Sequence, residues 1–269
     1  MTSEPETAAA APPPAPARPG NPWAGIVLDV LLAVAGIFIV SIILITPLLL
    51  LELVSLPEAE RLRATADPDL LMRGAMAEVT FAALVAMLLV ALGVWWLRGR
   101  SLPRPVPPTR AAHAAAWAIA AGVLIQGVVV ALFHVLQALG GESPAQPSNV
   151  EPILALQEAS PVLNWLMVVA VAPLAEELLF RRVMLHRFMV AGRGFAGLVL
   201  TSVLFAATHE VGQGGAHSLL QWLGLMAIYT GMGMGFGLVY LRTGRLSAAF
   251  LAHAACNATA LAVMAFSGG

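Results

Sequence analysis

Four polar side chains in the second half of the chain have the types and the spacing that reactions with water need. They are Glu176, His209, His253 and Asn257, and each lies within or beside an apolar run. A carboxylate in a low dielectric can act as a general base, and a neutral imidazole can take a proton from water or bind a metal. An asparagine amide can donate a hydrogen bond to a developing oxyanion. Because an ionisable group at bilayer depth costs about 2.5–3.5 kcal/mol on insertion, we interpret these residues as functional.

Helical spacing gives these residues partners. On a helix, Glu177 and Arg181 are i,i+4 neighbours with the acid on the N-terminal side, which is the better orientation for an ion pair. That pairing neutralises Glu177 and leaves Glu176, about 100° around the helix, free to face elsewhere. His253 and Asn257 are also four residues apart and share a helix face. The alternative is that the two glutamates mark a helix end at the membrane surface, but the apolar residues that flank them closely favour a site.

The composition of the chain indicates which kind of element carries these residues. Of its 269 residues, 59% are hydrophobic and 11% are charged, and the mean hydropathy is +0.84. Soluble domains are about 25% charged, so the sequence predicts an all-α, polytopic transmembrane helical bundle and excludes a soluble enzyme. A net charge of −1 provides no basic surface for nucleic acid. The single cysteine, Cys256, excludes an intramolecular disulfide, and we expect it to be a small buried hydrophobe.

Seven apolar segments approach or exceed the length of about 20 residues that a membrane span needs. They are residues 23–54, 79–97, 112–139, 161–184, 195–209, 218–241 and 246–266, of which the fifth is short. We accordingly divide the chain into three parts. These are a disordered Pro/Ala-rich N-terminal arm (1–22), three N-terminal helices with their loops (23–160), and a core that carries the polar residues above (161–269).

The arginines predict the orientation, because cytoplasmic loops are enriched in Lys and Arg. They are concentrated after the second, fourth and sixth spans and are absent from 140–160 and 210–217. This alternation predicts a cytoplasmic N-terminus and an external C-terminus. Segment 55–78 fits less well, since it holds three arginines among its acidic residues. All 14 basic residues are arginine, and this composition favours a bacterial source, which makes the bacterial cytoplasmic membrane the expected location.

Three short motifs stand in order on successive hydrophobic segments, whereas the zinc-protease motif H-E-x-x-H is incomplete after His209. The three motifs resemble E-E-x-x-x-R, F-x-x-x-H and H-x-x-x-N/D of the CAAX protease and bacteriocin-processing (CPBP) family of intramembrane endopeptidases. Their residues here are Glu176-Glu177…Arg181, Phe205…His209 and His253…Asn257. The sequence departs from the family at Arg182, where glycine is frequent.

The resemblance implies an endopeptidase site in a cavity open to the cytoplasm. Glu176 with His209 would activate the attacking water, and His253 with Asn257 would stabilise the tetrahedral oxyanion. Arg181 would be structural and hold the second glutamate. The substrate would be a membrane-associated peptide or protein, lipidated or not, and the lipid bilayer would be the other partner.

Two alternatives remain open at this point. The family has also been interpreted as metal-dependent, and Glu176, His209 and His253 would then be ligands of a divalent metal such as zinc. We favour the glutamate-activated water, which requires no cofactor. The chain could also be a non-catalytic membrane scaffold or bacteriocin-immunity protein of the same fold, although every motif residue is present.

Overall fold

A computed structural model describes residues 20–103, 105, 107–108, 110–138, 146–210 and 217–267, and in this part of the chain it contains helices and no strand. Most of the predicted arm, residues 1–19, lies outside the described residues. Asn21 and Pro22 belong to the first helix, because the Asn21 side chain accepts a hydrogen bond from the Trp23 N–H at 3.0 Å and Pro22 occupies the first turn. This cap satisfies a backbone donor that the helix itself cannot pair.

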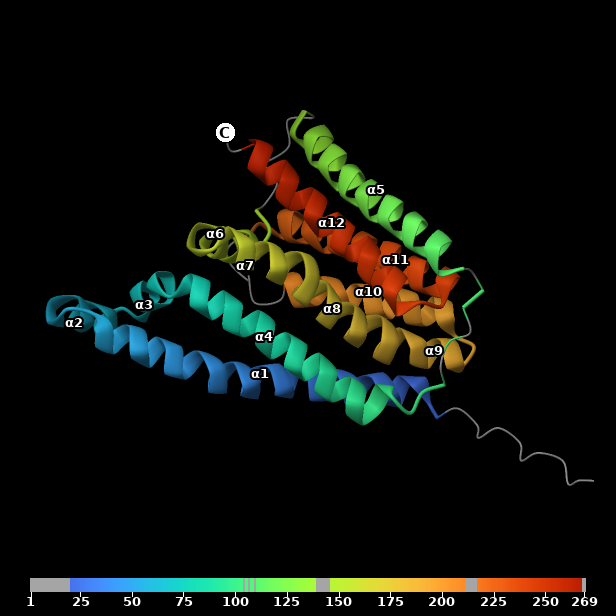
Figure 1. Ribbon diagram of the computed structural model, residues 1–269, viewed down its shortest axis with the longest axis horizontal. Coiled ribbons are helices and arrows are strands. Elements are labelled where there is room, and N and C mark those ends of the chain that lie inside the picture. The colour runs from blue at the N-terminus through green and yellow to red at the C-terminus, as the bar shows by residue number, and fades with distance from the viewer. Residues whose placement is uncertain are drawn as a thin grey trace, which may run out of the picture.

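The N-terminal part is an antiparallel pair of long helices (Figure 1). Helix α1 (Pro22–Ser55) runs the length of the molecule. Two short helices, α2 (Glu58–Ala66) and α3 (Pro68–Gly74), then turn the chain back into α4 (Met76–Val94), which continues as a π-helical turn, η1 (Trp95–Gly99). Because α1 and α4 are almost uniformly apolar, lipid must cover the faces of these two helices that other helices leave exposed.

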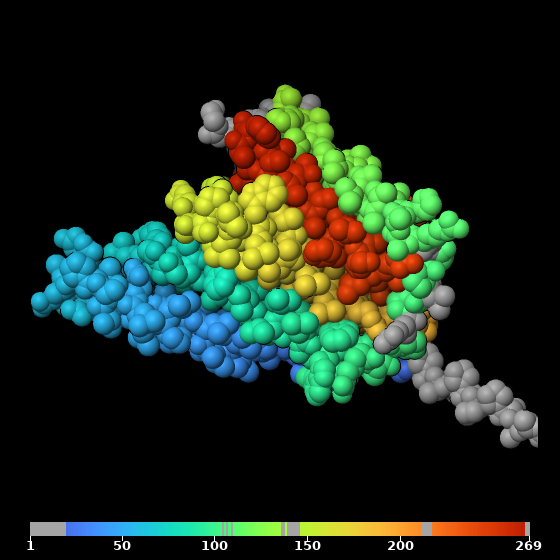
Figure 2. Space-filling view, in the orientation of Figure 1, coloured from blue at the N-terminus to red at the C-terminus, as the bar shows by residue number. Residues whose placement is uncertain are grey.

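The remaining helices surround the predicted site. They are α5 (Ala111–Ala138) and α6 (Val150–Ala159), then α7 (Pro161–Leu166), η2 (Met167–Val171), α8 (Ala172–Glu177), η3 (Leu178–Leu185) and α9 (His186–Val190), and finally α10 (Gly194–Glu210), α11 (Leu219–Thr243) and α12 (Leu246–Ser267). The elements from α7 to α9 follow one another without a break and form a single helical rod, Pro161–Val190. Helix α12 lies between this rod and α5 on the molecular surface (Figure 2).

Six of these helices are long and apolar enough to cross a membrane, which confirms the polytopic helical bundle. The seventh predicted segment, 195–209, is the 17-residue helix α10. At 1.5 Å per residue this helix is roughly 25 Å long, slightly less than the hydrocarbon core. It packs along α11 and reverses direction with its neighbours, so it takes the place that the sequence assigned to the fifth span.

The helices alternate in direction, so their charged residues collect at two opposite ends. The arginine-rich end carries eight described arginines, which are Arg98, Arg100, Arg110, Arg182, Arg187, Arg193, Arg242 and Arg245. The acid-rich end carries nine described acidic residues and three arginines, which are Glu52, Glu58, Glu60, Asp67, Asp69, Glu78, Glu151, Glu158 and Glu210 with Arg61, Arg63 and Arg73. In Figure 1 these ends lie at the right and the left, respectively.

An ion cluster around Asp29 of α1 lies inside the arginine-rich end. The Asp29 carboxylate is fully buried and forms ion pairs of 2.8 Å with both Arg98 and Arg187. The carboxylate therefore ties α1 to η1 and α9, three elements whose proximity no local pattern indicates.

Candidate active site

The predicted Glu177–Arg181 pair is present and lies in the protein interior. Arg181 Nε is 3.0 Å from Glu177 Oε2, and both side chains are fully buried. Arg181 also donates from a terminal nitrogen to the Gly233 carbonyl on α11 at 3.1 Å. The space for a side chain here is tight, because a Cβ on Gly233 would lie 3.1 Å from the Ser202 Cα and 3.3 Å from a Phe205 ring carbon. The glycine thus lets α10 and α11 approach closely.

His253 from α12 lies against both glutamates. Its Nδ1 is 2.9 Å from Glu177 Oε1, and its Nε2 is 3.6 Å from Glu176 Oε2. A carboxylate only accepts, so at the shorter contact Nδ1–H donates to Glu177 and Nε2 faces Glu176. The imidazole stacks on Phe236, with ring centroids 4.3 Å apart. Two contacts and a stacked ring hold this histidine in one orientation.

The carboxylate of Glu176 makes fewer close polar contacts than the carboxylate of Glu177. Its side chain is 13% exposed, and its Oε2 has no hydrogen-bond partner among the described residues although the atom is buried. A buried carboxylate oxygen of this kind is available to a water molecule or a substrate. The sequence predicted this division between a paired Glu177 and a free Glu176.

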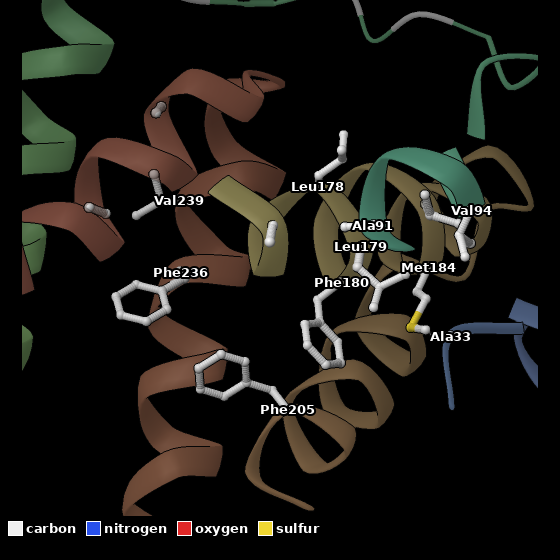
Figure 3. Close-up of a cluster of buried hydrophobic side chains, with 14 of the residues drawn as sticks. Ala33, Ala91, Val94, Leu178, Leu179, Phe180, Met184, Phe205, Phe236 and Val239 are labelled. Carbon is white, nitrogen blue, oxygen red and sulfur yellow. The ribbon is translucent and has the colours of Figure 1, made fainter. Parts of the chain in front are cut away.

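His209 lies near the end of α10, where its ring is held by its own helix and by α11. Its Nδ1 is 2.9 Å from the Phe205 carbonyl, and its ring stacks on Tyr229 with centroids 4.3 Å apart. Because a carbonyl only accepts, Nδ1 carries the proton and Nε2 is the free acceptor. The Phe205 ring contacts both imidazoles, at centroid distances of 4.6 Å to His209 and 5.8 Å to His253. Figure 3 shows Phe205 in a buried hydrophobic cluster with Phe180 and Phe236.

Asn257 binds at a gap in the backbone hydrogen bonding of the helical rod Pro161–Val190. In η2 the Ala172 N–H bonds to the Met167 carbonyl, five residues back, so the Val168 carbonyl would pair with residue 173. That residue is Pro173, which has no N–H. The Asn257 amide nitrogen donates to the Val168 carbonyl instead, at 2.9 Å. The amide group keeps a second N–H for a ligand.

The four predicted residues line one cavity of about 640 Å³. The structure therefore brings Glu176, His209, His253 and Asn257 together, as the sequence predicted. Most of the other lining is apolar. Tyr229, which supports His209 and donates to Asn149 at 3.2 Å, was not predicted. Apart from Thr230, the sequence close to it contains apolar residues and glycines, which indicate helix packing.

The metal-dependent alternative requires Glu176, His209 and His253 to converge on one ion. Among the residues that the structure describes, no group of three or more His, Cys, Asp or Glu side chains is arranged to hold one. His253 and His209 each donate Nδ1–H, to the Glu177 carboxylate and to the Phe205 carbonyl respectively, which is also how metal-ligating histidines are held. A divalent metal held by Glu176, His209 and His253 therefore stays the alternative to the glutamate-activated water, and the steps below are written for the side chains and water alone.

The fold and this cavity define a helical membrane protein with a buried Glu/His/Asn site. Residues 158–259, the segment that contains all three motifs, match the family described as type II CAAX prenyl endopeptidase Rce1-like. This confirms the CPBP resemblance and places the segment in a family of CAAX-type intramembrane proteases. Comparison with curated proteins and with solved structures gave no match.

Proposed function

We propose that this protein is an intramembrane endopeptidase in which Glu176 and His209 activate water. The observation that carries the proposal is the buried Oε2 of Glu176, which has no hydrogen-bond partner among the described residues, in a cavity that also contains His209, His253 and Asn257. Charge relations distinguish the two glutamates, since Glu177 is neutralised by Arg181 and Glu176 is free to act as a base.

The reaction begins with a water molecule that is bound in the cavity beside the Glu176 carboxylate. Glu176 takes one proton from the water and His209 Nε2 accepts a hydrogen bond from the remaining O–H, while the water oxygen attacks the substrate carbonyl carbon. Negative charge develops on the carbonyl oxygen and is stabilised by the free N–H of Asn257 and by His253 when Nε2 carries a proton. The C–N bond then breaks as Glu176 returns the proton to the leaving amine. Water is thus added across the peptide bond.

Glu177 and Arg181 act on the reaction through His253. The Glu177 carboxylate holds Nδ1 at 2.9 Å, and Arg181 compensates its charge in the protein interior. Removing either one would leave a buried charge without its partner. We assign both as positioning residues.

The substrate is a membrane-associated peptide or protein, lipidated or not. The apolar cavity walls suit an apolar segment, and the polar groups suit the peptide bond itself. The expected location is the bacterial cytoplasmic membrane, with the N-terminus cytoplasmic and the C-terminus external.

Cleavage of a fluorescently labelled, membrane-tethered peptide by the purified protein in detergent or vesicles tests the proposal. We expect the wild type to cleave and Glu176→Gln to lose turnover. Glu158→Gln, the same change on an exposed glutamate of α6 outside the cavity, is the matched control and should cleave normally. A wild-type protein that is folded and cleaves none of a set of tethered peptides would instead support the scaffold or immunity alternative.

A further inference from the structure

Gln126 is an amide side chain in the middle of the long apolar helix α5. Between His113 and His134, every other residue of this helix is glycine, aliphatic or aromatic. A polar group at bilayer depth costs free energy unless it finds a partner, so a residue of this type is a candidate for function. Gln126 lies outside residues 158–259, so the family match assigns it no role.

Close packing between α5 and α12 fixes the position of Gln126. These two helices begin at the arginine-rich end, run in the same direction and lie side by side (Figure 1). A Cβ on Gly122 would clash with the Ala252 carbonyl oxygen, so the two backbones are in contact at this level. One helical turn further along both helices, the Cys256 thiol donates to Gln126 Oε1 at 3.5 Å. Gln126 is therefore level with Cys256, the residue that precedes Asn257.

The Gln126 side chain belongs to the wall of the active-site cavity. Helix α5 lines the cavity with one face, at positions 126, 129, 130, 133 and 134. The Gln126 side chain is partly exposed, and its amide nitrogen makes no hydrogen bond to another described residue. Because the thiol donates to the amide oxygen, the NH₂ group keeps both of its donors for a ligand in the cavity.

A peptide that enters this cavity brings main-chain carbonyl groups with it. Each carbonyl that leaves water without gaining a new donor costs free energy, and most of the lining is apolar. In the proposed reaction, the carbonyl of the scissile bond meets Asn257 and His253. The carbonyls of neighbouring substrate residues need other donors, and Gln126 supplies two at the level of Asn257 on the adjacent helix.

We propose that Gln126 is a substrate-binding residue whose amide nitrogen donates to a main-chain carbonyl of the substrate next to the scissile bond. This inference rests on the proposed function. A helical segment pairs its carbonyls internally, so only a segment with an unwound main chain can use this donor. The contact therefore selects substrates by the extended conformation of the cleaved segment and leaves the side chains to the apolar walls.

A different role for Gln126 would be to hold α5 against α12 through Cys256, and two matched variants separate the two roles. Gln126→Leu removes the amide and keeps a side chain of similar size. Cys256→Ala removes the thiol that contacts the amide and leaves Gln126 in place. Both are made in the Glu176→Gln protein, so that binding is measured without turnover. The probe is a fluorescent, membrane-tethered peptide that the wild type cleaves, and its affinity is measured by fluorescence anisotropy in detergent.

We expect Gln126→Leu to weaken peptide binding by about tenfold, because a substrate carbonyl loses its donor, and Cys256→Ala to bind like the parent. Unchanged binding by Gln126→Leu would overturn the inference, and so would an equal loss in both variants, which would show a packing role. Should Gln126→Leu not fold, Gln126→Asn takes its place under the same criteria, since it keeps an amide that is one methylene too short to reach.

Ester substitution in the peptide identifies the carbonyl that Gln126 binds. Single main-chain amides of the probe on either side of the scissile bond are replaced by esters, whose carbonyls are weaker acceptors. One ester should weaken binding to the parent and have no effect on binding to Gln126→Leu; equal effects of every ester on both proteins would overturn the inference. A wild type that cleaves none of a set of tethered peptides would refute the proposed function and this inference with it, whereas the outcomes above refute the inference alone.

Discussion

Replacing each of the adjacent glutamates with glutamine tests the division of labour between them. The chemical change is identical at both positions, and each variant is the control for the other. Glu176 is partly exposed to the cavity, and its one charged contact is the 3.6 Å approach to His253. Glu176→Gln keeps the shape of the side chain and removes its ability to accept a proton from water. We therefore expect turnover to fall by about 10²–10⁴-fold, the usual contribution of a positioned general base, without loss of stability.

Glu177→Gln should behave differently, because Glu177 is fully buried between two partners. Arg181 lies 3.0 Å from one of its oxygens and His253 lies 2.9 Å from the other. Removing one member of a buried ion pair leaves an uncompensated charge, which costs about 3–5 kcal/mol of stability. Glu177→Gln should therefore lower the melting temperature in detergent and also reduce activity, since His253 loses its acceptor. Arg181→Ala should resemble it.

Peptide cleavage and thermal unfolding in detergent, measured on the same preparations, separate these effects. The reasoning requires Glu176→Gln to be folded and inactive, and Glu177→Gln and Arg181→Ala to be destabilised. A Glu176→Gln protein that still cleaves, beside a Glu177→Gln protein that is folded and inactive, would show that the two roles are exchanged. If all three variants cleave normally, the protease proposal itself is refuted.

Three further predictions concern the surroundings of the site. Asn257→Ala should reduce turnover in the cleavage assay by about 10²–10³-fold, as the loss of an oxyanion donor does. Thr259→Ala on the same helix is the control and should change turnover little, because the Thr259 hydroxyl donates to the Ala255 carbonyl of its own helix. Gly233→Val should destabilise the protein by about 1–3 kcal/mol through overpacking, as measured by thermal unfolding in detergent. Gly231→Val is the control and should not destabilise it, because a side chain there meets open space. Equal effects of the two substitutions would contradict the close approach of α10 and α11. Deleting residues 1–19 preserves the cap of α1 and should leave cleavage unchanged; loss of activity with normal membrane insertion would show that the arm takes part.

The sequence by itself determined the features that depend on local spacing. Long apolar runs require helices in a bilayer, because only a helix or a closed barrel pairs every backbone group there. A separation of four residues places Glu177 beside Arg181 and His253 on the face of Asn257, and both relations follow from the helical repeat. The cost of charge at bilayer depth then singled out the residues of the site.

Only the tertiary structure decided how these local faces meet. The contact of His253 with both glutamates, the support of His209 by Tyr229, and the burial of Asp29 each join helices that are distant in the chain. The capture of the Val168 carbonyl by Asn257 also needs α12 to lie against the interrupted rod. Packing between helices depends on shape complementarity across the whole bundle, and residue spacing within one helix carries no information about its neighbours.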